Sequence, residues 1–403
     1  MQIRGEGVVE MVRTTADISN KTGGTKFLNL LMLFTTAAWG PRVVFVSIYF
    51  SKSCGISLEQ IGVLIAVPII ISIFAGTAWG SFSDVTGRKK PFLIQSAFIM
   101  ALSTFAITLV SSFELLLLIG LFAAFLAPHA EGLMVASVFG FSSSQTRGTA
   151  YSRFVIWGSV GWIAATVVGG FVSSVFGVKA ALYLASLLFF IAMIVSFKVP
   201  EPRTGAITTP RRNYFAPTTE LLKKKEITIF LLILFPLFVA TNMGIFLPVY
   251  MDFLGASFAL ISIASTIPAI LEIPFYLYLG KVSDRIGKRK PLLIFSAFTS
   301  SLRFLLFALT SNPYLIFSIN SIVALTWPPL DVASSAFISD VLPSEKWVTG
   351  QTLYRIMLWG IAGTIGPFVG GLISGAWGLP VMFVFASALA AVSGIFSRRI
   401  TER

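Results

Sequence analysis

The chain has 403 residues, of which 56% are hydrophobic and 12% are charged. A soluble domain carries about 25% charged residues, so this composition excludes a soluble globular protein and indicates one that is integral to a membrane. The formal net charge of +13 would suit nucleic acid. However, the basic residues are sorted by side of the predicted spans, so we attribute the charge to membrane topology and expect no nucleic-acid partner.

Twelve continuous apolar runs are long enough to cross a bilayer as helices, which takes about 20 residues each. Because the runs are continuous and do not alternate with polar residues, they exclude a membrane β-barrel. In chain order, the predicted spans are 27–50, 58–80, 91–111, 113–138, 149–174, 178–198, 227–251, 258–280, 291–310, 313–341, 350–374 and 378–397.

The polar segments outside the spans define the predicted domains. A linker that carries "PEPRTGAITTPRRN" and "KKK" separates two sets of six spans. We therefore expect a cytoplasmic N-terminal tail over 1–26, an N-terminal six-helix bundle over 27–198, a cytoplasmic linker over 199–226, a C-terminal six-helix bundle over 227–397 and a cytoplasmic tail over 398–403.

The positions of the basic residues predict the orientation of the chain. Most Lys and Arg fall in the tails, the linker and the loops that follow even-numbered spans, whereas only Lys52 and Lys179 fall in the other loops. Loops rich in Lys and Arg face the cytoplasm. We therefore expect a multi-pass protein of the cytoplasmic membrane, with both termini in the cytoplasm.

The two halves of the chain repeat one another. "GSFSDVTGRKKP" begins at Gly80 and "GKVSDRIGKRKP" begins at Gly280. Further matches are Pro68 with Pro268, Pro128 with Pro328, Glu131 with Asp331 and, after a slip of two residues, Arg153, Trp157 and Gly161 with Arg355, Trp359 and Gly363. This series predicts two six-helix bundles that have the same orientation in the membrane.

The two basic loops resemble the signature of the major facilitator superfamily: a glycine, a small residue and Asp, then a basic residue, Gly and a basic pair. The resemblance covers the whole chain, and the C-terminal loop is the closer match because Val85 stands where the family usually has a basic residue. The resemblance implies an all-α membrane fold of twelve helices in two pseudo-symmetric bundles, and transport by alternating access.

A physical role for these loops follows from their composition. A tight helix connection needs glycine to turn, and cationic side chains hold the loop on the cytoplasmic face. Asp84 or Asp284 can cap a neighbouring helix or pair with an Arg, which would latch the bundles in one conformation. The alternative is that the loops only set topology. The candidate latch residues are Gly80, Asp84, Gly87, Arg88, Lys90, Gly280, Asp284, Arg285, Gly287, Lys288 and Lys290.

Shorter segments resemble particular branches of the superfamily. "WGSVGW" from Trp157, together with Arg303, is weakly similar to the lactose-permease-like and sugar-efflux branch, but Val155 replaces that branch's substrate-binding Arg and span 10 has no His. "GTIGPFVGG" from Gly363 resembles the glycine-proline motif of proton-driven exporters, although those exporters carry it in helix 5. Neither likeness specifies a substrate.

Seven charged residues lie well inside predicted spans, where each is a functional candidate because it costs a few kcal/mol or more to bury in lipid. The candidates for gating or proton coupling are Glu131, Arg153, Glu272, Asp331 and Arg355. Each half places an acid and an Arg at similar depth. These pairs either hold helices together as static struts or exchange partners as the transporter opens and closes.

The remaining two intramembrane charges, Arg42 and Arg303, are candidates for the substrate cavity, together with Trp39 and Trp327. Arg42 has no basic counterpart in span 7, so a symmetric pair of arginines that clamps a phosphate is poorly matched. Arg42 either binds a substrate carboxylate or hydroxyl or pairs with an internal acid.

These features predict a secondary active transporter that moves a small organic solute across the cytoplasmic membrane by alternating access, coupled to protons. The alternatives are a drug or sugar exporter that exchanges solute for protons, a lipid flippase and a non-transporting receptor. An enzyme is disfavoured because the sequence has no metal-ligand cluster, no Ser-His-Asp arrangement and no GxxxxGK phosphate loop. We expect a monomer in the lipid bilayer, with no metal and no cofactor.

Overall fold

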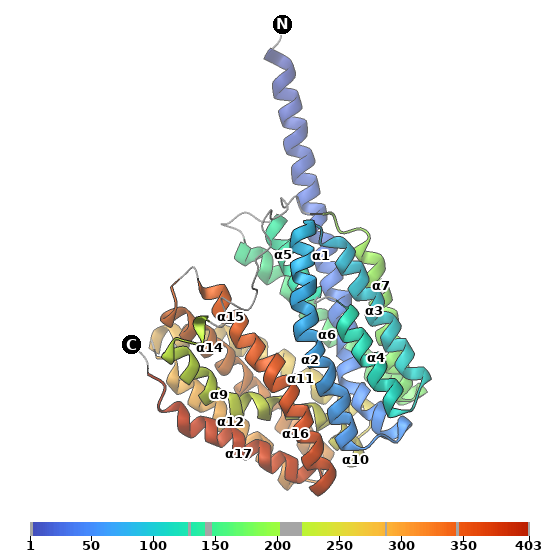
Figure 1. The fold of residues 1–403 in the computed structure, drawn as a ribbon, viewed down its shortest axis with the longest axis vertical. Coiled ribbons are helices and arrows are strands. Elements are labelled where there is room, and N and C mark those ends of the chain that lie inside the picture. The colour runs from blue at the N-terminus through green and yellow to red at the C-terminus, as the bar shows by residue number, and fades with distance from the viewer. Residues whose placement is uncertain are drawn as a thin grey trace.

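The computed structural model describes the backbone of residues 3–127, 130–141, 147–201, 220–286, 288–343 and 346–401. Within these ranges, the side chains of 3–25, 84, 139–140, 147–150, 152, 277, 280–281, 283–284, 286 and 348 are not described. The described parts of the chain fold into helices joined by short turns, as expected for an all-α membrane protein (Figure 1).

Both bundles are built from long helices. The N-terminal bundle contains α1 (Ile3–Cys54), α2 (Leu58–Thr86), α3 (Lys90–Ala106), α4 (Phe113–Leu126), α5 (Ala130–Phe141), α6 (Arg147–Phe176) and α7 (Val178–Ser196). The C-terminal bundle contains α9 (Lys225–Met243), α10 (Leu247–Phe253), α11 (Phe258–Ile286), α12 (Lys290–Leu309), α13 (Pro313–Asn320), α14 (Trp327–Val341), α15 (Trp347–Arg355), α16 (Ala362–Trp377) and α17 (Leu379–Ser397).

The described residues form twelve helical segments that are long and apolar enough to cross a membrane, which confirms the number of spans predicted from the sequence. Several of these segments are interrupted. Span 10 consists of α13, a short 3₁₀ turn (Ser321–Leu325) and α14, and span 11 contains a π-helical turn (Ile356–Ile361) between α15 and α16. Prolines 328 and 329 open α14, where their missing N–H groups cost nothing.

The backbone repeats between the two halves, as the sequence does. Gly55 and Gly255 follow the first spans of the two halves, with φ of +68° and +79°, and Gly177 and Gly378 follow the fifth spans, with φ of +84° and +87°. Only glycine adopts this left-handed region without strain. These turns lie at the end of the molecule that the charge pattern places outside, which we refer to as the outer end.

The two bundles contact one another at the outer end through two symmetry-related helix crossings. Gly62 of α2 faces Gly371 of α16 so closely that a Cβ on Gly371 would lie 2.9 Å from the Cα of Gly62. In the counterpart, Gly170 of α6 packs on Ser262 of α11, whose hydroxyl donates to the carbonyl of Thr166 at 2.6 Å. Small residues permit this backbone approach, which drives helix association where no water is expelled.

An ion pair between the halves lies at the same end. Nζ of Lys52, at the end of α1, is 2.9 Å from Oδ1 of Asp252 in α10. These two residues are themselves 200 positions apart in the chain. Because the repeat offset is also 200 residues, Lys52 pairs with the residue at its own equivalent position in the other bundle.

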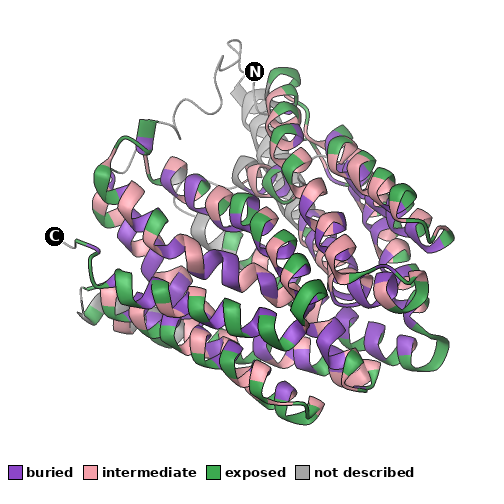
Figure 2. Cartoon of the chain, turned by 60° about the horizontal axis from the view of Figure 1, so that its bottom comes forward, coloured by how far each residue is buried: buried purple, intermediate pink, exposed green. Residues whose placement is uncertain are grey.

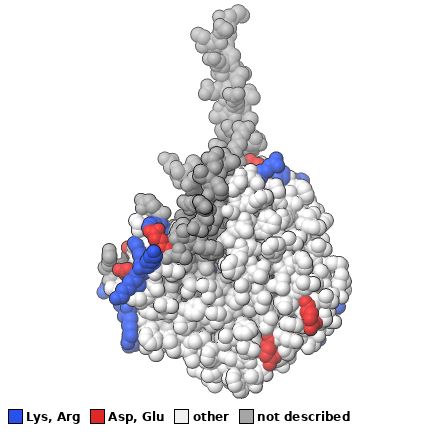
Figure 3. Space-filling model, in the orientation of Figure 1, with Lys and Arg blue, Asp and Glu red and all other residues white. Residues whose placement is uncertain are grey.

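The outward surface is apolar over a broad band. Large hydrophobic side chains such as Phe171, Phe176 and Leu309 are mostly exposed, whereas the buried residues of each helix face its neighbours (Figure 2). On the face drawn in Figure 3, charged side chains lie towards the upper and left edges and in two acidic patches near the lower end, and the wide white area between them carries none. This distribution suits a lipid-facing belt with charges at the two membrane surfaces.

Candidate solute and coupling site in the C-terminal bundle

A cavity of about 250 Å³ lies within the C-terminal bundle. Two charged residues, three hydroxyl groups and two tryptophans contribute to its wall, so polar groups line part of a space inside the apolar helices of this bundle. The lining residues are Thr241, Glu272, Ser300, Arg303, Val323, Thr326, Trp327, Leu330 and Trp359. Three of these, Glu272, Arg303 and Trp327, are candidates that the sequence predicted separately, and the fold brings them to one wall.

Arg303 of α12 is held in place by a buried hydrogen-bonded chain. It is only 8% exposed, and its Nη1 donates to Oδ1 of Asn320 at 3.0 Å. Its guanidinium also lies 4.6 Å from the ring centre of Phe304. This packing fixes the charge in position, because both hydrogen bonding and the aromatic face stabilise a guanidinium removed from water.

Asn320 connects this arginine to a proline kink in α11. Its Nδ2 donates to the carbonyl of Ala264 at 2.8 Å. That carbonyl has no partner inside its own helix, because the residue four positions later is Pro268, which has no N–H. Asn320 thus satisfies a helix carbonyl and a buried charge together, which ties three helices of the bundle at this point.

Glu272 occupies the middle of α11, between Pro268 and Pro274. Its carboxylate lines the cavity and, among the residues that the structure describes, has no hydrogen-bond or ion-pair partner. Arg303 lies on the same wall, but the two side chains do not form a direct ion pair. The carboxylate is therefore open to whatever enters the cavity.

Two tryptophans form the aromatic part of the wall. The rings of Trp327 and Trp359 are 5.5 Å apart between centroids and tilted by 48°. Trp327 is the first residue of α14, and Trp359 lies in the π-helical turn of span 11. Rings arranged in this way offer a face on which a planar group of a solute can stack.

A second cluster connects the cavity helices to the opposite, inner end of the bundle. Oδ1 of Asp331 is 3.9 Å from Nη2 of Arg355, and the Tyr276 hydroxyl donates to Oδ2 of Asp331 at 3.4 Å. Asp331 is 19% exposed and Arg355 is 53% exposed. The pair that the sequence predicted in this half is thus brought together, at the outer limit of ion-pair distance.

The matching residues of the N-terminal half are arranged differently. Glu131 and Arg153 are both exposed, and the described part of the chain contains no ion pair between them. Arg42 lies over the ring of Trp39 at 5.1 Å, and Trp39 packs edge-on against Phe189. Neither Arg42 nor Trp39 lines the C-terminal cavity.

The N-terminal basic loop is shaped by backbone contacts. Gly87 has a φ of +64° between α2 and α3, which is the turning conformation expected of it. The Ser83 hydroxyl donates to the carbonyl of Arg88 at 3.0 Å. The carboxylate of Glu201, at the start of the linker, accepts from the backbone N–H groups of Lys89 and Lys90 and so caps α3.

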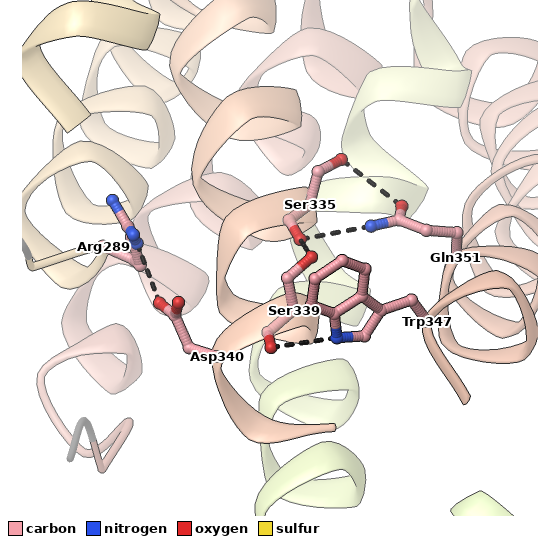
Figure 4. Close-up of polar contacts among 6 residues, drawn as sticks. All are labelled: Arg289, Ser335, Ser339, Asp340, Trp347 and Gln351. Atoms are coloured by element: carbon pink, nitrogen blue, oxygen red, sulfur yellow. Dashed lines mark hydrogen bonds and ion pairs between the residues drawn. The ribbon is translucent and has the colours of Figure 1, made fainter. Parts of the chain in front are cut away.

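The C-terminal basic loop is tied to α14. Nε of Arg289 is 2.9 Å from Oδ2 of Asp340, and the Trp347 indole donates to the carbonyl of Ser339 at 3.1 Å (Figure 4). Arg285, Lys288 and Lys290 surround this contact in the chain. The side chains of Asp84 and Asp284, the surroundings of Gly280, and all of Gly287 lie outside the described residues, so the latch stays a prediction.

Several contacts that organise the site were not predicted from the sequence. Glu201, Asp340 and Asn320 had no distinguishing pattern, because each acts on a partner far away in the chain. Arg289 belongs to the quoted basic loop, but its partner Asp340 was not predicted. One signal was available: a proline inside a span frees the carbonyl four residues before it, so Pro268 pointed to a polar partner for Ala264.

Twelve apolar helices in two repeated bundles, with a charged cavity among them, define a membrane transporter of the major facilitator type. The chain belongs to the MFS_1 like family, whose sequence profile matches residues 26–385. Membership confirms the superfamily resemblance of the two basic loops, and the family consists of transporters, which are not enzymes.

Comparisons with individual proteins agree with this assignment. The chain is 24% identical to the multi-drug resistance efflux pump PmrA of Streptococcus pneumoniae over 380 residues, which cover 90% of this chain and 92% of the pump. The nucleoside transporter NupG superposes with a TM-score of 0.78 at 19% identity, over 93% of this chain and 98% of NupG. A bacterial homolog of the lysosomal transporter Spinster, in an inward-facing and unoccupied conformation, gives 0.74 at 14% identity, over 94% and 98%.

Proposed function

We propose that this protein is a proton-coupled secondary active transporter that binds a small organic solute in the C-terminal cavity. The observation that carries the proposal is Glu272, which lines that cavity in the middle of a spanning helix and makes no hydrogen bond or ion pair with the described residues. An ionised carboxylate at the centre of a bilayer costs at least about 2.5–3.5 kcal/mol. Protonation removes this cost, so a proton at Glu272 is a natural coupling ion.

The lining of the cavity supports a ring-bearing solute with polar substituents. Trp327 and Trp359 offer an aromatic surface, while the hydroxyl groups of Thr241, Ser300 and Thr326 offer hydrogen bonds around it. Sites for drug-sized ligands run from about 300 to 1,000 Å³. The smaller space of about 250 Å³ favours a molecule, or the part of one, about the size of a single ring. A nucleoside, the solute named for NupG, carries a planar base that could occupy such a space and a ribose whose hydroxyl groups could reach the polar wall.

In this proposal, the contacts between the two bundles control access to the site from the outer end. The glycine crossings and the pair of Lys52 with Asp252 close the outer end, and they separate when the site opens there. The charge pattern supports an orientation with both termini in the cytoplasm and a lipid belt around the apolar band. We propose that a monomer suffices, because the cavity is lined by one chain.

Flux into proteoliposomes tests the proposal. Purified protein is reconstituted, a pH gradient is imposed, and uptake is measured for a panel of labelled uridine, maltose and ethidium. We expect accumulation of at least one member that collapses when a protonophore is added. Glu272→Gln should abolish accumulation but preserve exchange of labelled for unlabelled solute, because exchange needs no net proton cycle. Glu114→Gln, an exposed acid near the outer end of span 4, is the control and should behave as wild type.

Two other results would redirect the proposal. Full proton-driven accumulation in Glu272→Gln removes Glu272 as the carrier, and Asp331→Asn and Glu131→Gln are then tested in the same way. Retention of accumulation in all three variants contradicts proton coupling through an intramembrane carboxylate. A second candidate function is export in exchange for protons, and the efflux named for the PmrA pump favours the export part of it. It predicts that solute moves against the proton flow when the gradient is reversed.

A further inference from the structure

Span 11 contains a π-helical turn, Ile356–Ile361, between α15 and α16. Such turns are rare insertions in α-helices and occur frequently at functional sites. One functional candidate lies directly before this turn and another lies within it. Arg355, the residue before it, contacts Asp331, and Trp359, within it, lines the cavity beside Trp327.

The turn has a specific polar partner in α9. Nδ2 of Asn242 donates to the carbonyl of Leu358 at 2.9 Å and to the carbonyl of Phe238 in its own helix at 2.8 Å, so both amide hydrogens are used. Where α-helical bonding changes to the wider π pattern, a carbonyl loses its ordinary N–H partner. Leu358 lies inside the π turn, and Asn242 supplies its carbonyl with a donor from another helix.

The glycine face of α16 allows Asn242 to approach this closely. A Cβ on Gly366 would lie 2.7 Å from Cβ of Asn242, and a Cβ on Gly363 would lie 3.6 Å from its Oδ1. Any larger residue at Gly366 would push α9 and α16 apart and pull the amide away from Leu358. The contact is thus built by both helices.

We propose that Asn242 is a positioning residue for the solute site: it holds the π turn that presents Trp359 to the cavity while keeping Arg355 in register with Asp331. The inference rests on the proposed function in one respect, the use of this cavity by the solute. Adjacent residues of an α-helix are rotated by about 100°. If the turn relaxed to a regular α-helix, α15 would rotate by about this amount relative to α16, so Trp359 and Arg355 could not both keep their contacts.

The N-terminal bundle lacks the equivalents of Asn242 and of the π turn in its described residues. The repeat places Arg42 at the position of Asn242, and α6, the counterpart of span 11, is α-helical throughout Arg147–Phe176. Nε of Arg42 is buried and has no hydrogen-bond partner in the described part of the chain. The half with the π turn is also the half with the polar cavity.

Cysteine labelling in membrane vesicles tests the inference without needing transport or a known solute. In a Cys54→Ser background, which removes the only cysteine, Trp359→Cys reports whether position 359 faces the cavity. The probe is methanethiosulfonate ethylammonium, applied to everted vesicles and detected by mass tagging. Asn242→Leu is similar in size and has no group that can donate to Leu358. We expect it to slow labelling at least fivefold, because position 359 turns into the helix packing.

A second variant and a control complete the test. Gly366→Ala displaces Asn242 from the other side and should slow labelling to a similar extent. Ser387→Ala removes an interhelical hydrogen bond to Ser301, 2.8 Å long, elsewhere in the same bundle and should change the rate less than twofold. Rates within twofold of the parent for both Asn242→Leu and Gly366→Ala would overturn the inference. Failure of the proposed function would appear separately, as absence of proton-driven flux with the labelling result intact.

Discussion

Replacing Gly371 with Ala should open the outer end of the transporter. The Cβ would lie 2.8 Å from the carbonyl oxygen of Leu58 and 2.9 Å from the Cα of Gly62, both backbone atoms that cannot rotate away. Helices α2 and α16 must therefore separate. Overpacking of this kind costs about 1–3 kcal/mol, and the cost falls only on the state in which this crossing is closed.

A difference of about 1–3 kcal/mol between two states shifts their ratio about 5- to 150-fold. The distance between spin labels at Ser57→Cys and Trp377→Cys, in a Cys54→Ser background, measures this shift by pulsed electron resonance. These positions are exposed and adjoin the crossing helices at the outer end. We expect Gly371→Ala to increase the long-distance population at the expense of the short one.

Gly132→Ala is the matched control, because no atom lies within 4 Å of the Cβ that it would add. It should leave the distance distribution of the parent unchanged. Gly170→Ala, at the symmetry-related crossing, should act as Gly371→Ala does, since its Cβ would overlap Ser262. If Gly371→Ala and Gly170→Ala both keep the short distance, then the glycine crossings do not hold the outer end closed, and the reasoning is refuted.

Two further predictions concern stability. Asn320→Ala should lower the free energy of unfolding by about 1.5–3 kcal/mol, because it removes the hydrogen bond that the buried Arg303 charge donates to Asn320. Thermal unfolding in detergent checks this, and Asn312→Ala, which removes an exposed helix cap, should cost only about 0.5–2 kcal/mol. The hydrogen bond from Lys346 holds the pKa of Glu220 below its ordinary value of 4.5. Their contact should therefore stabilise the fold above that pH and be lost as pH falls below it, so Lys346→Gln should flatten the acid side of a stability profile. An unchanged acid side would contradict this.

The sequence alone determined the architecture of this protein. Apolar runs of membrane-spanning length can only be helices in lipid, and the count of twelve follows from their number. The repeat of "GSFSDVTGRKKP" as "GKVSDRIGKRKP" gave the twofold organisation, and the structure matches it in the glycine turns and crossings. These features depend on local composition or on periodicity along the chain, so they can be predicted from the sequence alone.

The intramembrane charges were also visible in the sequence, because lipid penalises each one wherever it lies. The partners of these charges were not visible in the sequence. Glu131 with Arg153 and Asp331 with Arg355 occupy corresponding places in the two halves, apart from the slip of two residues, and have a similar predicted depth, yet only the second pair is in contact among the described residues. A separation of 3.9 Å depends on how neighbouring helices rotate and tilt, and spacing along one chain does not specify this.

Only the tertiary structure decided where the cavity lies. Arg42 and Arg303 were equivalent candidates in the sequence, but Arg303 joins Glu272 and Trp327 on one wall while Arg42 stacks on Trp39 elsewhere. Two backbone carbonyls of the C-terminal bundle accept hydrogen bonds from other helices: the one freed by Pro268 accepts from Asn320, and that of Leu358 in the π turn accepts from Asn242. A helix in lipid must satisfy every such group within the protein, and which helix supplies the donor is set by packing.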